Sequence, residues 1–477
     1  MPPITRPPLG DALAYADRWL DYRRRTLRLP GVAAAVAWRG EVVLSRAYGH
    51  ADVGRDVALT PRHVFRIASH SKTFTATCVL QLAEQGRLGL DDRLARWLDW
   101  APDGEGGLGR VTLRQLLGHA AGVVRDGDDG GFWQLERGFP DRDEFVERVT
   151  RLAPVFAPNV QFKYSNFGYT LLGMVVEAVT GTPYNEHVRA AVVAPLGLRR
   201  TGPELDDVAR ANLAIGYSRD AGGLDRVPIA HVDTRAMSPA TGFYSTAEEL
   251  CRYGSAHCLG TGELLGDEWK REMQRDAWPV DDGGDEHYGL GFSIARVGER
   301  RVVGHGGGFP GFITATRIDP EERLVVVVLT NASDGPAADL AHGVIRLVNR
   351  ACGAGAAGGE RPGVDVSRFA GRFWSLGGAV DVAPLGAELL ALDPEAADPL
   401  AEVTELRVEA PDRLRIARTR NHGSPGEAVR YAFDAAGAVS HVRFGAQTLR
   451  PWEAFERVSL APLRETGRAT PRDPLTS

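Results

Sequence analysis

Strand-forming runs stand at both ends of the first 350 residues, and helical patterns fill the stretch between them. Near the beginning, residues 32–38 and 42–48 are rich in β-forming residues and flank Arg39-Gly40, a pair typical of a hairpin turn. Strand signals return as a group at 289–297, 302–304, 312–318 and 324–330. Strands at both ends with helices between them predict an α+β fold, in which an antiparallel sheet is closed by its termini, is flanked by helices and carries an all-helical insertion.

Three segments outside these strands carry a helical period. Apolar residues recur at helical spacing from Leu13 to Leu27, which predicts an opening helix that ends before Pro30. Residues 69–86 repeat apolar side chains every four positions and close on a glycine, so they predict a second helix. A last helix is expected over residues 337–350.

The composition changes after residue 350. A stretch rich in Ala and Gly follows, and beyond it apolar residues alternate in short runs around turn sequences. A chain of 477 residues also exceeds the roughly 250–300 residues that one core holds. We therefore expect a main domain over 1–350, a linker over 351–363, a small all-β, barrel-like domain over 364–460 and a flexible tail over 461–477.

Charge and hydropathy exclude several classes of function. The formal net charge is −6, so the chain lacks the basic surplus that holds nucleic acid. No apolar run approaches the roughly 18 residues of a membrane span, and the first residues lack a secretion signal. The four cysteines form no CxxC pair and no metal-site spacing. We expect a cytoplasmic protein with no nucleic-acid or membrane partner, no cofactor and no metal.

Lysine is almost absent, which makes each lysine informative. Of the 56 basic residues, only Lys72, Lys163 and Lys270 are lysines. A buried lysine amine can lose its proton and act as a base, whereas arginine stays charged. Lys72 follows Ser69 by three positions at the start of a predicted helix, so both side chains share one face. Lowering the lysine pKa to about 7–8 costs some 3–5 kcal/mol, which requires a packed pocket.

Two further polar elements follow in order along the chain. Tyr164-Ser165-Asn166 precedes a helical run, and His305-Gly306-Gly307-Gly308 lies between two strand-like segments. Taken singly, each element has an ordinary structural explanation, such as a helix cap or a glycine turn. Together with Ser69 and Lys72 they predict the lining of one cleft.

These elements resemble the serine β-lactamase and penicillin-binding-protein superfamily, in particular its class C-like branch with D-aminopeptidases, DD-peptidases and carboxylesterases. The similarity covers roughly residues 30–350. Residues 65–72 match the nucleophile box, 162–166 the YxN box and 305–307 the position of the KTG box. Residues 113–119 and 195–198 resemble flanking segments of the same family.

The resemblance implies a role for each of these residues. Ser69 is the nucleophile, and Lys72 with Tyr164 forms the relay that moves its proton. Asn166 holds the acyl amide of the substrate, and the backbone N–H groups of Ser69 and Gly308 form the oxyanion hole. Without side chains, Gly306, Gly307 and Gly308 let a substrate backbone approach closely.

His305 departs from the lysine that lactamases carry at this position. A neutral imidazole would support the relay, whereas a cationic one would bind a substrate carboxylate; the two alternatives predict opposite pH dependence. The histidine is similar to that of D-aminopeptidases and some DD-peptidases. The resemblance therefore implies a serine hydrolase acting through an acyl-enzyme on an amide or peptide bond, with a carboxylesterase or weak β-lactamase as the alternative. A small molecule, peptide or ester is the expected substrate, and a homo-oligomer is possible.

Other features receive a structural interpretation. Residues 104–109 fit GxGxxG but follow no strand, which argues against a dinucleotide site. His231-Val232-Asp233 and the acidic stretch 281–286 lack metal-site spacing and are expected to be surface loops. His119 and Tyr288 stay outside the predicted catalytic set, with a packed or hydrogen-bonded structural role. A non-catalytic binding or scaffold protein with the same fold remains the competing hypothesis.

Overall fold

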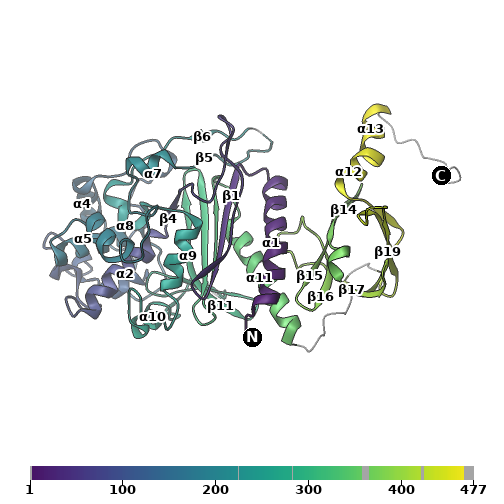
Figure 1. The fold of residues 1–477 in the computed structure, drawn as a ribbon. Helices are drawn as coiled ribbons and strands as arrows, with labels where there is room; N and C mark the ends of the chain where they lie inside the picture. The colour runs from purple at the N-terminus through teal and green to yellow at the C-terminus, as the bar shows by residue number, and fades with distance from the viewer. Residues whose placement is uncertain (1–2, 224, 282, 357–364, 421–423, 467–477) are drawn as a thin grey trace. The chain divides into compact units, whose positions relative to one another are not determined.

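The computed structural model describes residues 3–223, 225–281, 283–356, 365–420 and 424–466 (Figure 1). Backbone contacts divide the chain into two compact units. One unit is Leu27–His342, and the other combines Met1–Thr26 with Gly343–Ser477. The opening helix, α1 (Arg6–Thr26), is thus grouped with the C-terminal part of the chain.

A nine-stranded antiparallel sheet forms the centre of the unit Leu27–His342 (Figure 1), with the strand order β3-β2-β1-β13-β12-β11-β10-β9-β8. Its strands are β1 (Gly31–Trp38), β2 (Glu41–Asp52), β3 (Val57–Ala58), β8 (Trp278–Pro279), β9 (His287–Tyr288), β10 (Ser293–Val297), β11 (Arg300–Phe309), β12 (Phe312–Asp319) and β13 (Leu324–Thr330). β1 pairs with β13 from Val32↔Thr330 to Trp38↔Leu324. The two ends of the unit therefore meet inside the sheet, as the sequence predicts.

The strands at this junction are buried on both faces. Every residue of β1 and β13 is buried, which explains why they read as continuous Ala/Val and Val/Leu runs rather than as alternating ones. Helix α9 (Ala247–Ala256) packs on β1, β12 and β13. Gly254 of α9 makes this approach possible, because a Cβ there would lie 2.8 Å from Val325 Cγ1.

The insertion between β3 and β8 is mainly helical. Its helices are α2 (Ser71–Glu84), α3 (Leu113–Leu117), α4 (Arg142–Arg151), α5 (Asn166–Thr180), α6 (Tyr184–Val188), α7 (Asp207–Ala211), α8 (Ser238–Thr241), α9 and α10 (Asp267–Met273), with short 3-10 or π turns at 94–96, 108–110, 131–134, 189–193 and 235–237. Two short antiparallel pairs accompany them: β4 (Phe65–Ala68) with β7 (Phe243–Ser245), and β5 (Gly216–Tyr217) with β6 (Pro228–Ile229). Helices α2, α5 and α8 pack on one another.

Helix α2 is fixed in the core by aromatic stacking. Its Phe74 stacks on Phe243 of β7 with ring centroids 4.2 Å apart, and on Tyr253 of α9 at 3.8 Å. These contacts hold the first turn of α2 beside the central sheet, and α2 begins directly after Ser69 and His70. The segment that carries the predicted nucleophile is therefore supported on two sides.

The C-terminal part of the chain forms a barrel-like sheet, as predicted. Eight antiparallel strands follow one another in sequence order: β14 (Gly371–Ser375), β15 (Gly378–Leu385), β16 (Glu388–Leu392), β17 (Val403–Ala410), β18 (Arg413–Arg418), β19 (Ala428–Phe433), β20 (Val439–Phe444) and β21 (Gln447–Leu449). Trp374 of β14 exchanges two backbone hydrogen bonds, of 2.7 and 2.9 Å, with Arg450 just after β21. This bridge nearly closes the barrel around a core that includes Phe369, Leu414, Val429 and Val442.

Helices flank the predicted linker and begin the predicted tail. Helix α11 spans Ala337–Ala356 and so includes the first residues of the expected linker, whereas 357–363 lie outside the described residues. A 3-10 turn (Val366–Phe369) precedes the barrel, and α12 (Trp452–Phe455), a π turn (Glu456–Leu460) and α13 (Ala461–Thr466) follow it. The expected tail beyond α13, 467–477, also lies outside the described residues. Over the part of the chain that is described, no helix has the length and apolar character of a membrane span.

Candidate active site

Ser69 stands in the turn between β4 and α2. Ala68 before it adopts a left-handed backbone with φ 45°, a conformation that costs free energy for a residue with a Cβ. Ser71 secures the turn: its hydroxyl donates to the Ala68 carbonyl at 2.5 Å and accepts from the Phe243 N–H at 3.0 Å. Ser69 itself is only half-buried. Its hydroxyl is therefore held at the surface of a rigid turn.

Lys72 is fully buried and points at Ser69. Its Nζ lies 3.2 Å from Ser69 Oγ, 2.7 Å from Asn166 Oδ1 and 2.9 Å from the Ala240 carbonyl. Burial lowers the pKa of Lys72 well below its usual value, although the nearby Asp126 carboxylate opposes this shift. A neutral amine has two N–H groups for the two carbonyl oxygens and one lone pair left for the Ser69 hydroxyl.

Tyr164 approaches the same hydroxyl from another side. Its phenol donates to Ser69 Oγ at 2.8 Å, and Lys72 Nζ lies 4.8 Å from the centre of its ring. Burial raises the pKa of Tyr164, so the phenol keeps its proton near neutral pH. Lys72 and Tyr164 thus converge on Ser69 Oγ, with the amine as the better proton acceptor.

Asn166, the first residue of α5, connects Lys72 to a residue that the sequence analysis missed. Its Oδ1 accepts from Lys72, and its Nδ2 donates to Asp126 Oδ1 at 2.7 Å. Ser165 caps the helix by accepting from the Gly168 N–H at 2.8 Å. Asp126 lies in a loop rich in Asp and Gly, where nothing in the sequence sets one carboxylate apart from its neighbours.

One edge of β11 is open next to Ser69. β10 pairs with β11 over Arg300–Gly304 only, so within the described residues His305–Phe309 has a strand partner, β12, on one side alone. A Cβ on Gly307 would lie 2.1 Å from the Ile67 carbonyl oxygen, so only glycine lets β11 pack against β4 here. Gly308 is exposed at this edge. The predicted glycine segment therefore lies beside the nucleophile turn.

His305 is buried with both ring nitrogens in hydrogen-bond contact. Nδ1 lies 2.6 Å from the Gly306 carbonyl, to which it donates, and Nε2 lies 3.0 Å from the Tyr288 hydroxyl, from which it accepts when the ring is neutral. Burial lowers the pKa of His305 well below its usual value, and the nearby Lys72 acts in the same direction. The lowered pKa favours the neutral alternative over a cation that binds carboxylates.

His70 and His119 are buried beside these groups and were not predicted as site residues. The His70 ring contacts the Ile67 carbonyl at 2.8 Å and Thr316 Oγ1 at 2.9 Å, and burial lowers its pKa to about 4. The centre of the His119 ring lies 4.3 Å from that of Tyr164 and 4.8 Å from that of Tyr288. Sequence spacing alone does not predict that a histidine is buried among polar groups, so neither residue could be identified in this way.

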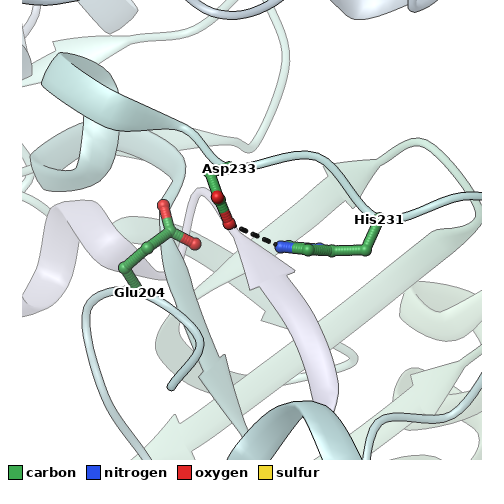
Figure 2. Close-up of side chains that lie close together, drawn as sticks. All are labelled: Glu204, His231 and Asp233. Atoms are coloured by element: carbon green, nitrogen blue, oxygen red, sulfur yellow. Dashed lines mark hydrogen bonds and ion pairs between the residues drawn. The ribbon is translucent and has the colours of Figure 1, made fainter. Parts of the chain in front are cut away.

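A cluster of possible metal ligands lies in the same unit, formed by Glu204, His231 and Asp233. Figure 2 shows the two carboxylates near each other, with His231 Nε2 bonded to Asp233 at 2.8 Å. Glu204 is already paired: it accepts from the buried Arg66 guanidinium and from the N–H of Thr234 at 2.8 Å. Asp233 also pairs with Arg210 at 3.3 Å, so each carboxylate of the cluster has a guanidinium partner, and a metal ion here would have to bind beside both.

Known proteins resemble this chain along most of its length. Penicillin-binding protein 4* of Bacillus subtilis (strain 168) is 27% identical over 320 residues, which cover 62% of this chain and 66% of that protein. The match therefore spans slightly less than two thirds of this relative. The structure of an octameric penicillin-binding protein homologue from Pyrococcus abyssi superimposes with a TM-score of 0.63 at 22% identity, covering 92% of this chain and 99% of that one. This second likeness is one of fold.

A solved hydrolase whose name specifies D-stereospecificity is also similar to this chain. The structure of a D-stereospecific amidohydrolase from Streptomyces sp. superimposes with a TM-score of 0.60 at 25% identity, covering 69% of this chain and 96% of that one. The family model described as Beta-lactamase matches residues 16–350, which include Ser69, Lys72, Tyr164, Asn166 and His305. The resemblance seen in the motifs is therefore confirmed, and the chain belongs to the Beta-lactamase family.

Proposed function

We propose that this chain is a serine hydrolase that cleaves an amide bond beside a D-residue through an acyl-enzyme on Ser69. The observation that carries the proposal is the convergence of Lys72 Nζ and the Tyr164 hydroxyl on Ser69 Oγ, at 3.2 and 2.8 Å. These distances are within reach of direct proton transfer. A nucleophile needs such a base because an isolated serine hydroxyl reacts slowly at neutral pH.

Acylation follows from this arrangement. The neutral amine of Lys72 takes the proton of Ser69 while Oγ bonds to the substrate carbonyl carbon, and the carbonyl oxygen becomes an oxyanion. The Ser69 N–H donates no hydrogen bond to any described residue, and Gly308 lies at the open edge of β11. These two N–H groups are suited to bind the oxyanion. When the C–N bond breaks, the proton passes from Lys72 to the leaving amine through the Tyr164 hydroxyl.

Deacylation repeats these steps with water. The amine of Lys72 is neutral again after the first product leaves, so it can take a proton from an attacking water, directly or through Tyr164. Water adds to the ester carbonyl, and the tetrahedral intermediate collapses as the proton returns to Ser69 Oγ. Ser69 is half-buried rather than enclosed, which leaves water a path to the ester.

The state of His305 supports an uncharged substrate at this edge of the cleft. Because both of its ring nitrogens are hydrogen-bonded and its pKa is lowered, His305 offers no cation to a substrate carboxylate. A cephalosporin or a peptide with a C-terminal carboxylate therefore lacks one attractive contact that a lysine would supply. An amide or ester without that carboxylate would make no such contact, so the absence of a lysine does not weaken its binding. The D-preference rests on the likeness to the Streptomyces amidohydrolase.

Hydrolysis of a small substrate panel tests the proposal. We would measure turnover of a D-aminoacyl amide, its L-enantiomer, an activated ester and a cephalosporin, with Ser69→Ala as the control. The proposal expects the highest kcat/KM for the D-amide, and loss of turnover in the control. Preference for the ester or the cephalosporin would replace the amide assignment by the esterase or lactamase alternative. A folded protein that turns over none of the four substrates would overturn the proposal that the chain is a serine hydrolase.

A further inference from the structure

His119 contacts the backbone on both sides of Tyr164. Its carbonyl oxygen accepts from the Lys163 N–H at 2.7 Å, and its ring Nδ1 accepts from the Ser165 N–H at 3.1 Å. Tyr164 is the single residue between these two bonds. One buried residue therefore fixes the chain immediately before and immediately after the phenol that touches Ser69 Oγ.

The His119 ring also packs against the Tyr164 ring. The ring centroids lie 4.3 Å apart, and the rings of Phe162, Tyr169 and Tyr288 surround the imidazole at 5.6, 5.0 and 4.8 Å. His119 itself has φ 58°, in the left-handed region, directly after the end of α3. This conformation belongs to the C-terminal cap of α3, in which the His119 N–H donates to the Leu116 carbonyl at 3.2 Å and the Ala120 N–H donates to the Gln115 carbonyl at 2.8 Å.

The hydrogen bond to Ser165 requires a neutral imidazole. Because Nδ1 accepts a proton from the Ser165 N–H, the ring proton is on Nε2, and this atom has no hydrogen-bond partner among the described residues. A second proton on Nδ1 would point at an N–H group and remove the bond. Burial keeps the pKa of His119 well below its usual value, and a positive charge on Lys72, His305 or Arg125 nearby would act in the same direction.

We propose that His119 is a positioning residue: its ring Nδ1 and its carbonyl hold the turn from Lys163 to Ser165 so that the Tyr164 hydroxyl stays in contact with Ser69 Oγ. The inference rests on the proposed reaction at Ser69. His119 touches neither the substrate nor the transferred proton. Its effect is on proton transfer rather than on binding, since a displacement of about 1 Å at a reacting group can cost roughly 100-fold in rate.

Three substitutions of His119 separate the hydrogen bond from the packing. His119→Asn places an amide oxygen near the position of Nδ1, and asparagine tolerates the left-handed backbone. His119→Gln carries the same amide one bond further out, near the position of Nε2, and so misplaces the acceptor. His119→Gly adopts the backbone freely but offers no acceptor. All three variants remove the aromatic ring.

Steady-state kinetics on the best substrate of the panel is the test. We expect His119→Asn to keep kcat within about tenfold of wild type, while His119→Gln and His119→Gly lower kcat about 10- to 100-fold further with KM little changed. In a Tyr164→Phe background the difference between Asn and Gln should vanish, because His119 acts through the phenol. If the glycine variant does not fold, the comparison of kcat between the Asn and Gln variants still tests the positioning role.

Equal losses of kcat in the Asn and Gln variants would overturn the positioning role. So would a difference between these two variants that persists in the Tyr164→Phe background. Thermal unfolding of each variant identifies losses that follow stability alone. Failure of the proposed function is recognised separately, because wild-type protein would then show no turnover that Ser69→Ala removes.

Discussion

The side-chain amide of Asn166 donates to Asp126 Oδ1 at 2.7 Å, and this bond determines which way the amide faces. Because Nδ2 faces Asp126, the amide oxygen faces Lys72 Nζ. There it accepts a hydrogen bond from one of the two N–H groups of the neutral amine. Asp126 in turn pairs with Arg125 at 3.3 Å. The Asp126 carboxylate therefore influences Lys72 in two ways, through the amide it orients and through its charge.

Replacing Asp126 separates these two effects. Asp126→Asn keeps an oxygen for Asn166 but removes a negative charge that raises the pKa of Lys72, so that pKa falls further. The amine then stays neutral at lower pH, and the acid limb of the pH–kcat/KM profile moves to lower pH. Asp126→Ala should also lower kcat, because the amide of Asn166 is free to turn. An unchanged acid limb in Asp126→Asn would contradict the electrostatic link.

Lys72 is expected to be indispensable as the base. In Lys72→Ala, turnover should fall by about 10²- to 10⁴-fold, the usual contribution of a positioned base. Lys72→Arg should be no better, because a guanidinium keeps its proton and cannot accept that of Ser69. Steady-state kinetics with thermal unfolding as the control for folding checks both variants. Turnover at the wild-type rate in either variant would refute the relay.

A charge at position 305 should change substrate preference. His305→Lys introduces a cation at the open edge of β11, so KM for a cephalosporin should fall relative to KM for a neutral amide. His305→Gln stays neutral and serves as the matched control. If the two variants show the same ratio of KM values, a charge at this position does not select the substrate.

Buried histidines should make the fold sensitive to acid. Burial lowers the pKa of His70 to about 4 and that of His257 to about 3, and it lowers the pKa values of His119 and His305 as well. Unfolded histidines titrate near 6.5, so below this pH the unfolded state binds more protons. Each histidine then costs up to about 1.4 kcal/mol of stability per pH unit as the pH falls.

Denaturant unfolding between pH 7 and pH 4.5 measures this loss. The free energy of unfolding should fall progressively as the pH decreases below about 6.5. A free energy that does not change down to pH 4.5 would show that these four histidines titrate normally in the folded protein.

The sequence predicts the sheet and the motif residues because both follow local rules. β1 and β13 are continuous apolar runs that end at turn sequences, and Ser69 lies one turn from Lys72, so their proximity follows from spacing. The linker over 351–363 stays a prediction, and within it Ala351 and Cys352 are buried and continue α11. Alanine favours helix as readily as a flexible segment, and only packing decides between them.

The partners of the motif residues could not be predicted in the same way. The Ala240 carbonyl that accepts a hydrogen bond from Lys72 belongs to the backbone, so the identity of the residue does not reveal this contact. Asp126 is one of several acidic residues in its loop, and its role depends on where that loop meets α5. His119 was interpreted as a packed or hydrogen-bonded structural residue, and its contacts on both sides of Tyr164 emerge only when residues far apart in sequence are brought together.

Intact-protein mass spectrometry after mixing with substrate determines whether Ser69 carries the acyl group. The protein is incubated with the D-aminoacyl amide and with the activated ester, quenched in acid, and digested to locate any added mass. We expect an acyl adduct on the peptide that contains Ser69, absent in Ser69→Ala and formed much more slowly in Lys72→Ala. An adduct on another residue, or turnover that continues unchanged in Ser69→Ala, would contradict this expectation.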